Sequence, residues 1–153
     1  TLKDIEDFNS KYRRDEAIWW YTQEKIFYRL LNEGLRLLDT GILLDMGFFI
    51  HDLDQFIKRL HRKQAAKIGD EEFVVYRGQG LSEAALEELK NSEGQVMSYN
   101  TFLSTSRQRS ESLAFTRAAS RKANTVGILF VMKIDPKLKS APFADVKDYS
   151  RYK

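Results

Sequence analysis

The 153-residue sequence predicts an α+β fold in which a helical N-terminal half is followed by a mixed β-sheet. Over about residues 1–70, apolar residues recur at intervals of three and four, which is the period of an amphipathic helix. Over about residues 71–153, runs of β-branched and aromatic residues bounded by glycine or proline are typical of strands. We expect one domain with these two parts, because a chain of this length suits a single core.

Two amphipathic segments account for the helical half. The first carries one face along residues 18–35, with Asp15 placed to cap its start. Residues 39–41 (Asp-Thr-Gly) interrupt the pattern. A second face follows over residues 43–60, long enough for about five helical turns. Asp52 and Asp54 lie on this segment, and we interpret them as surface carboxylates rather than as a catalytic pair.

The second half alternates strands with short helices. We expect a strand over residues 73–77 that stops at the glycines of residues 78–80, and a helix that begins at Ser82. Residues 96–106 are expected to be extended, and Ser110 to cap a further helix. The apolar run over residues 125–134 predicts a strand that is central or buried on both faces. A last strand is expected to start at residues 141–144.

Composition excludes several classes of protein. With 42% hydrophobic and 31% charged residues the chain is globular. It has no cysteine, which excludes disulfides, a thiol nucleophile and Cys-containing metal sites. Two histidines ten residues apart argue against a histidine metal site, so we expect no metal. The absence of cysteine also favours a reducing interior over secretion, without excluding the latter.

Motifs exclude further classes. The chain has no Gly-x-Ser-x-Gly elbow and no Walker loop. Its apolar runs are too short to cross a bilayer, and no signal peptide opens it, so we expect no membrane partner. The net charge of +3 is too small to indicate nucleic-acid binding, which we do not expect.

The charge is unevenly distributed along the chain. Residues 1–72 hold 12 basic and 14 acidic side chains, whereas residues 73–153 hold 13 basic and 8 acidic ones. The second part suits an anionic partner, such as a phosphate-bearing ligand or an acidic protein surface. The alternative is a basic face that is simply solvated.

Three short segments contain candidate functional residues. Arg77 ends an apolar strand beside Gly78, where a planar guanidinium suits a phosphate and the glycine lets a ligand approach the backbone. Residues 102–106 place Ser104 and Ser106 on one face of an extended segment and Thr105 on the other. Tyr28 and Asn32 share one helix face because they are four residues apart. Each segment alone has an ordinary structural explanation: a hairpin arginine, common serine usage, a core tyrosine.

Taken together and in this order, the segments resemble the mono-ADP-ribosyltransferase family of the Arg–Ser–Glu class. The class includes the arginine-specific animal enzymes and the clostridial actin-modifying toxins. The resemblance extends from about residue 12 to the C-terminus. It is carried by residues 17–22, by Tyr28, Asn32, Leu35 and Arg36, by residues 75–78, by Phe102 and residues 104–106, and by residues 113–115, 127–134 and 141–143.

The resemblance implies an ADP-ribosyltransferase fold and a set of NAD-binding residues. Arg77 would bind the NAD diphosphate, and Gly78 would give access to the nicotinamide amide. Ser104 would orient a catalytic glutamate, and Phe115 would pack on the nicotinamide.

Four further residues would support the bound NAD. Thr105 and Ser106 would hold the strand that carries Ser104. Tyr28 and Asn32 would line the phosphate and adenine side. NAD would be a co-substrate, and an unidentified acceptor protein would be the other partner of a monomeric enzyme.

One part of the family pattern is missing. The family ends its site with Glu-x-Glu or Gln-x-Glu on a late strand, whereas Glu111 is the last glutamate here. We therefore expect a C-terminally truncated and inactive segment that lacks its final strands. A natural pseudoenzyme is the alternative. A Glu-x-Glu in the coding sequence beyond Lys153 would distinguish the two.

The function implied is transfer of ADP-ribose from NAD to a protein side chain, with arginine the expected acceptor, and release of nicotinamide. The reaction passes through an oxocarbenium-like transition state that needs a fixed counter-charge. The alternative is a non-catalytic protein-binding module of the same fold.

Overall fold

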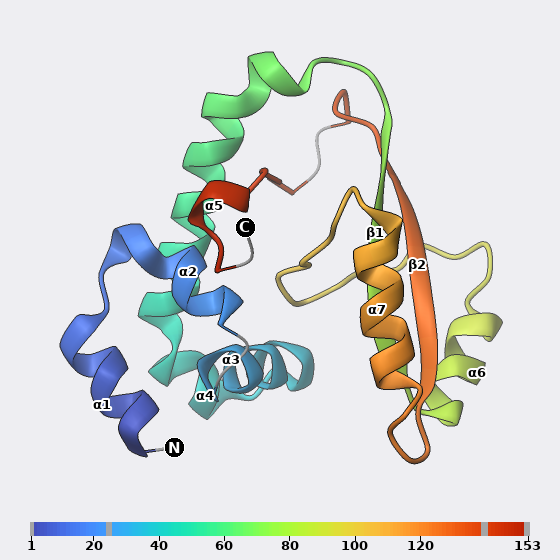
Figure 1. Cartoon of the computed structure of the whole chain (residues 1–153), viewed down its shortest axis with the longest axis horizontal. Helices are drawn as coiled ribbons and strands as arrows, with labels where there is room; N and C mark the ends of the chain where they lie inside the picture. The colour runs from blue at the N-terminus through green and yellow to red at the C-terminus, as the bar shows by residue number, and fades with distance from the viewer. Residues whose placement is uncertain (1, 24–25, 139–140, 152–153) are drawn as a thin grey trace. The chain divides into compact units, whose positions relative to one another are not determined.

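A computed structural model of the chain describes residues 2–23, 26–138 and 141–151. Within these residues the fold is α+β, with a helical first half and a two-stranded antiparallel sheet (Figure 1). The chain divides into two compact units, one formed by residues 1–69 and 139–153 and the other by residues 70–138. We call these the helical unit and the sheet unit.

The helical unit contains five α-helices and two short 3₁₀ turns within the described residues. They are α1 (Leu2–Lys11), η1 (Arg14–Glu16), α2 (Ala17–Thr22), α3 (Ile26–Leu37), α4 (Thr40–Asp45), α5 (Gly47–Ile68) and η2 (Lys147–Tyr149).

Aromatic side chains form the centre of the helical unit. Phe8 of α1 is buried, and its ring lies 4.0 Å from that of Phe27 and 5.2 Å from that of Trp20. It also meets Phe49 of α5 edge-on at 5.6 Å. Such offset and edge-to-face pairs stabilise a core beyond the burial of their area. Phe8 therefore joins α1 to α2, α3 and α5.

The helix ends differ from the prediction in two places. The face predicted over residues 18–35 is divided between α2 and α3, and that over residues 43–60 between α4 and α5.

Asp39 caps α4 by accepting a hydrogen bond from the Ile42 amide at 3.1 Å. The capping role predicted for Asp15 is wrong, because α2 has Glu16 at its N-cap and no side-chain cap. Asp15 instead pairs with Arg13.

Asp52 is the clearest exception to the surface role predicted for this part of α5. Its side chain is 7% exposed and accepts a hydrogen bond from the Tyr12 hydroxyl at 2.8 Å. Arg14 Nε lies 3.4 Å from its other oxygen. A buried carboxylate needs partners of this kind, so Asp52 connects the turn after α1 to α5.

Residues 141–151 belong to the helical unit and contain no strand. The strand start predicted at residues 141–144 is therefore wrong. The Phe143 carbonyl lies 2.8 Å from His61 Nδ1, and Gln64 exchanges two hydrogen bonds of 2.8 Å with the Asp145 backbone. Side chains of α5 thus take the place of a partner strand.

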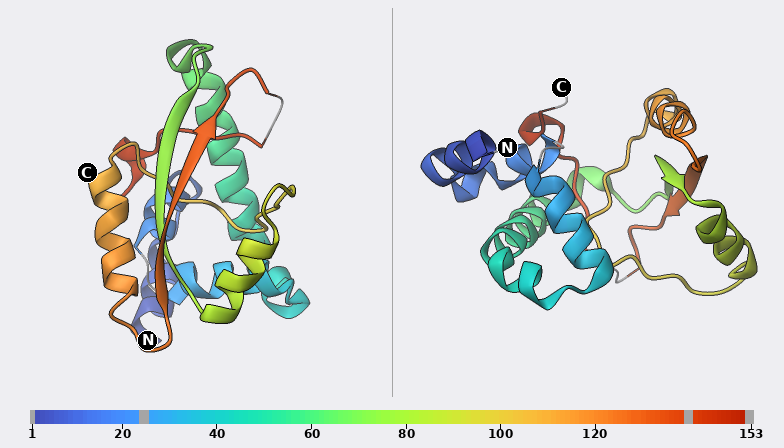
Figure 2. Two further views of the ribbon diagram at one scale, coloured as in Figure 1. Left: turned by 90° about the vertical axis from the view of Figure 1, so that its right-hand side faces the viewer. Right: turned by 90° about the horizontal axis from the view of Figure 1, so that it is seen from below.

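In the sheet unit a two-stranded ribbon is covered by helices (Figure 2). Strand β1 (Phe73–Leu81) pairs antiparallel with β2 (Val126–Ile134), with Phe73 opposite Ile134 and Leu81 opposite Val126. Between them along the chain lie α6 (Glu83–Asn91) and α7 (Arg109–Ala119). Ser82 caps α6 as predicted, accepting from the Ala85 amide. The cap predicted at Ser110 is wrong: Gln108 is the N-cap and Ser110 lies inside α7.

Glycines let α7 lie against the ribbon, and they do not end β1. The prediction that residues 78–80 stop the strand is wrong, because Gly78 pairs with Leu129 and Gly80 with Gly127. A Cβ on Gly78 would overlap the Ser112 carbonyl oxygen, and one on Gly80 would lie 3.0 Å from the Ala119 Cβ. These positions are thus glycine because the helix approaches the strand too closely for a side chain.

The sheet is simpler than predicted. In the described part of the chain it has two antiparallel strands and is not mixed. The extended segment expected over residues 96–106 is not a strand, since only Ser106 forms a bridge, with Tyr76. Strand β2 is not buried on both faces either, because Val131 is 62% exposed.

Candidate functional site

Arg77 lies in the middle of β1 and is held by two hydrogen bonds. Its Nη1 donates to the Ser104 carbonyl oxygen at 2.9 Å, and its Nε donates to Gln79 Oε1 at 3.2 Å. Side chains alternate along a strand, and Gly78 and Gly80 face α7. The Arg77 and Gln79 side chains therefore belong to the opposite face of the ribbon.

The two hydrogen bonds orient the guanidinium without neutralising it. A guanidinium has five N–H donors, and these bonds use only two of them. Among the described residues no carboxylate forms an ion pair with Arg77. The half-buried cation thus keeps donors for an anion, and its planar fork suits a phosphate.

The segment that carries Ser104 is also bonded to β1 through Ser106, which pairs with Tyr76, the residue before Arg77. The Ser106 amide donates to the Tyr76 carbonyl at 2.9 Å, and the Tyr76 amide donates to the Ser106 carbonyl at 2.8 Å. Backbone groups of alternate strand residues face the same edge of a strand. The Gly78 N–H and C=O therefore face the edge of β1 at which residues 104–106 lie.

Glu111 is a site residue that the sequence reasoning missed. The Ser106 hydroxyl donates a short hydrogen bond to Glu111 Oε2 and accepts one from the Gln108 amide at 3.0 Å. Glu111 lies in the first turn of α7, where the positive end of the helix favours a carboxylate. The sequence could have indicated Glu111 from its place in the first turn of a predicted helix. It could not have indicated which serine the carboxylate would bind.

The other predicted residues of the sheet unit are exposed. Ser104 and Thr105 lie on the surface, and Arg77 contacts the Ser104 main chain rather than its hydroxyl. Phe115 of α7 is 47% exposed. The structure thus brings Arg77, Ser104 and Ser106 together at one edge of β1.

A small cavity lies beside Gln79 on the Arg77 face of the ribbon. Its volume is about 230 Å³, and its walls include Leu81, Leu89 of α6, Tyr99 and Phe130. Phe130 is the residue of β2 that pairs with Arg77. The cavity is smaller than most ligand pockets, which measure about 300–1,000 Å³, so it has room for one ring or small group.

Tyr28 and Asn32 lie together in α3, in the helical unit. Asn32 Nδ2 donates to the Tyr28 carbonyl at 2.7 Å, and Asn32 Oδ1 accepts from the Tyr21 hydroxyl at 3.2 Å. The rings of Tyr21 and Tyr28 lie 5.0 Å apart. These contacts join α2 to α3, so both residues have a structural role within their own unit.

Among the described residues, no group of three or more His, Asp or Glu side chains is arranged to hold a metal ion. No helix in these parts of the chain is both long and apolar enough to cross a membrane.

Comparisons of the chain with protein families, curated proteins and solved structures find no match. Arg77 and its neighbours therefore define the site by their own chemistry: an oriented cation beside an exposed strand edge.

Proposed function

We propose that this chain contains the NAD-binding part of a mono-ADP-ribosyltransferase of the Arg–Ser–Glu class. The reaction transfers ADP-ribose from NAD to a protein side chain, with arginine the expected acceptor, and releases nicotinamide. The proposal rests on the sequence resemblance together with the arrangement around Arg77.

The observation that supports it best is the guanidinium held against the Ser104 carbonyl at 2.9 Å. Two motifs that are 27 residues apart in the chain meet at this bond. An arginine with unused donors, beside backbone groups at a strand edge, suits a ligand that has both a diphosphate and an amide. NAD has both groups.

A non-catalytic module of the same fold is the second candidate. One observation favours it: the Asn32 side chain is already bonded within the helical unit. Such a module would keep the fold and bind a protein partner.

Binding of NAD to three forms of the chain tests the proposal. Saturation-transfer NMR at millimolar NAD should detect binding by the wild type. Arg77→Ala should weaken it about tenfold or more, the effect of losing one charge-assisted hydrogen bond. Arg121→Ala removes an equal charge from an exposed position of the same unit and should change binding less than twofold. Absence of NAD binding, or an equal loss in both variants, would contradict the proposal and leave the non-catalytic module.

A further inference from the structure

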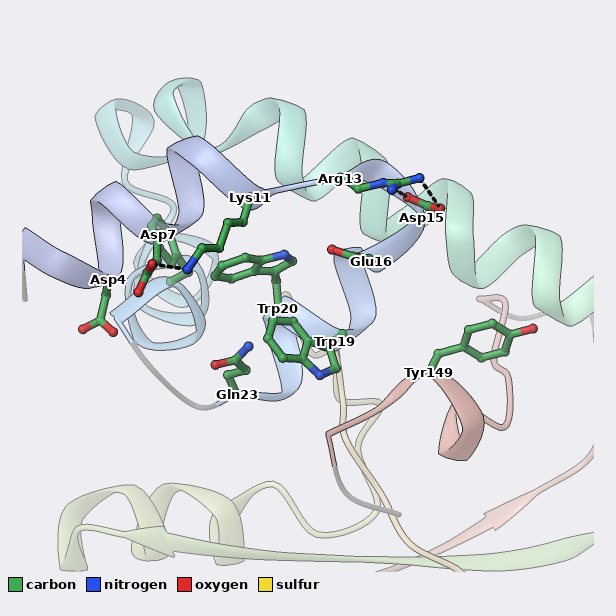
Figure 3. A pocket seen from close by; sticks show the side chains of 11 residues that line it. Asp4, Asp7, Lys11, Arg13, Asp15, Glu16, Trp19, Trp20, Gln23 and Tyr149 are labelled. Carbon is green, nitrogen blue, oxygen red and sulfur yellow. Dashed lines mark hydrogen bonds and ion pairs between the residues drawn. The ribbon is translucent and has the colours of Figure 1, made fainter.

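A larger cavity lies in the helical unit, formed by α1, η1, α2 and the start of α3 (Figure 3). Its volume is about 550 Å³. In its wall Lys11 is paired with Asp7 at 2.6 Å, and the side-chain N–H groups of Trp20 and Gln23 are buried. These groups do not select a ligand. The outer edge of β2, in the sheet unit, has the donor and acceptor pattern of an unpaired strand, and this pattern does select a partner.

Strand β2 has β1 as its one neighbour in the described sheet (Figure 1). The Tyr76 N–H and C=O are bonded to Ser106, which lies on the side of β1 away from β2. Opposed residues of an antiparallel pair alternate between those that exchange hydrogen bonds and those that do not. Tyr76 and Val131 are therefore a pair without such bonds, and the Val131 N–H and C=O face away from β1.

The same alternation places the backbone groups of four residues at the outer edge of β2: Gly127, Leu129, Val131 and Lys133. In the described part of the chain, no hydrogen bond joins these groups to another segment. None of the nine residues of β2 is buried, and Val131 is 62% exposed. A near-continuous apolar run is typical of a strand with neighbours on both sides, so β2 has the sequence of a central strand at the edge of a sheet.

The edge also lacks the features that keep exposed strands apart. Proteins protect such edges with proline, charge, bulges or short strands. Strand β2 is nine residues long, contains no proline and pairs with β1 without a bulge. Its one charged residue, Lys133, lies near its end, with Nζ 2.5 Å from Glu72 Oε2 of the same unit. A second strand can therefore approach without meeting an unpaired charge.

We infer that the outer edge of β2 binds the same edge of a second copy of this chain, so that two ribbons form one four-stranded antiparallel sheet. A two-fold axis relates identical antiparallel strands, so each contact is made twice. With the axis at Phe130, Leu129 lies opposite Val131 of the partner subunit, and Gly127 lies opposite Lys133 of the partner subunit. No other axis position pairs all four outer residues with one another. Residues 126–132 carry no charge, so the two copies do not repel each other there.

The association stops at two copies. Residues 104–106 already lie along the outer edge of β1, where Ser106 pairs with Tyr76 and the Ser104 carbonyl accepts from Arg77. Each ribbon therefore offers β2 alone to a second strand, and a two-fold pairing closes on itself. The dimer departs from the monomer expected from the sequence, and it does not depend on NAD binding.

Sedimentation equilibrium of the whole chain, over about 1–300 µM, should show a monomer–dimer equilibrium. Val131→Lys places like charges beside the axis and should weaken the dimer about tenfold or more. Val96→Lys adds the same charge at a fully exposed position of the same unit and should change the affinity less than about twofold. Both valines are exposed, so both variants keep the fold, which circular dichroism checks. A monomer at every concentration, aggregates in place of a dimer, or equal effects of the two variants would overturn the inference and leave the edge to another strand.

Introduced thiols test the register, because the chain has no cysteine. Opposed Cα atoms of a bonded antiparallel pair lie about 5.5 Å apart, within the range of a disulfide. A mixture of Leu129→Cys and Val131→Cys chains should therefore cross-link several-fold faster than either variant alone. Val96→Cys is the control and should cross-link no faster than random collision allows. A mixture that cross-links no faster than its separate components, or no faster than Val96→Cys, would overturn the inference.

Discussion

Asp52 in the helical unit and Arg77 in the sheet unit are charged side chains with opposite surroundings. Both oxygens of Asp52 have partners in the helical unit, Tyr12 and Arg14, and its side chain is 7% exposed. Arg77 in the sheet unit keeps unused donors and is half-buried. A charge with its partners supplied by the chain stabilises the fold, whereas an oriented charge with free donors is available to a ligand.

The Tyr12–Asp52 hydrogen bond should contribute to the stability of the helical unit. Tyr12→Phe should lower the free energy of unfolding by about 1–3 kcal/mol, because it leaves a buried carboxylate oxygen without its donor. Tyr28→Phe is the matched control, since among the described residues the Tyr28 hydroxyl forms no hydrogen bond, and it should cost less than about 0.5 kcal/mol. Urea unfolding followed by tryptophan fluorescence measures both values. Equal losses in the two variants would contradict the role given to Tyr12.

The same bond predicts a pH dependence. Burial, together with the Asp52 carboxylate, raises the pKa of Tyr12 well above its usual value of 10.0. The folded chain therefore retains this proton where the unfolded chain loses it. The stabilisation is fully present below pH 10 and decreases as the pH rises towards the pKa of the folded state. Urea midpoints across this range should decline less steeply in Tyr12→Phe than in the wild type, and parallel curves would contradict the assignment.

Among the helices and strands, α7 and the ribbon pack so closely that their contact leaves no room for larger side chains at the strand glycines. Gly78 lies under the Ser112 carbonyl, and Thr116 Oγ1 donates to the Ile128 carbonyl of β2 at 3.2 Å. The helix and both strands are therefore joined at a surface without room for another methyl group.

Gly78→Ala should consequently destabilise the sheet unit by about 2 kcal/mol or more, because the new Cβ meets backbone atoms that cannot move aside. Gly47→Ala is the control: nothing lies within 4 Å of the new Cβ, and alanine favours the helix by up to about 1 kcal/mol. Thermal unfolding followed by circular dichroism should show a lower transition temperature for Gly78→Ala and not for Gly47→Ala. An unchanged transition in Gly78→Ala would show that α7 does not pack on β1 in this way.

Periodicity predicted several of the elements but neither all of them nor their ends: it gave no indication of α1, and the strand start expected at residues 141–144 is absent from the described residues. The spacing of apolar residues predicted the helical half, and the apolar run near residue 130 predicted β2. The error at Gly78 arose because glycine usually interrupts a strand, and only α7, which lies about 30 residues later, explains its presence. Asp15 and Ser110 are good capping residues by type, yet the chain caps neither helix with them.

For the whole molecule, the sequence indicated candidate residues but not the contacts that they make. Arg77 and Ser104 do meet, as their motifs suggested, but through a main-chain carbonyl that every residue type possesses. Residue identity therefore could not have predicted this bond. The sequence also could not have predicted the cavity beside Trp20 and Gln23. The residues that line a cavity depend on which helices pack together, and residue types alone do not show this.

The division into two units also affects the proposed NAD site. Arg77, Ser104, Ser106 and Phe115 belong to the sheet unit, and Tyr28 and Asn32 belong to the helical unit. The proposal therefore depends first on the sheet unit, which contains the Arg77 guanidinium and the segment that it contacts.

A map of backbone amide chemical shifts during titration with NAD would locate the bound dinucleotide residue by residue. The largest shifts should fall on Gly78 and on residues 104–106, since these backbone groups flank the Arg77 guanidinium. The shifts should disappear in Arg77→Ala. Shifts confined to other parts of the chain, or unchanged in that variant, would contradict NAD binding at this site.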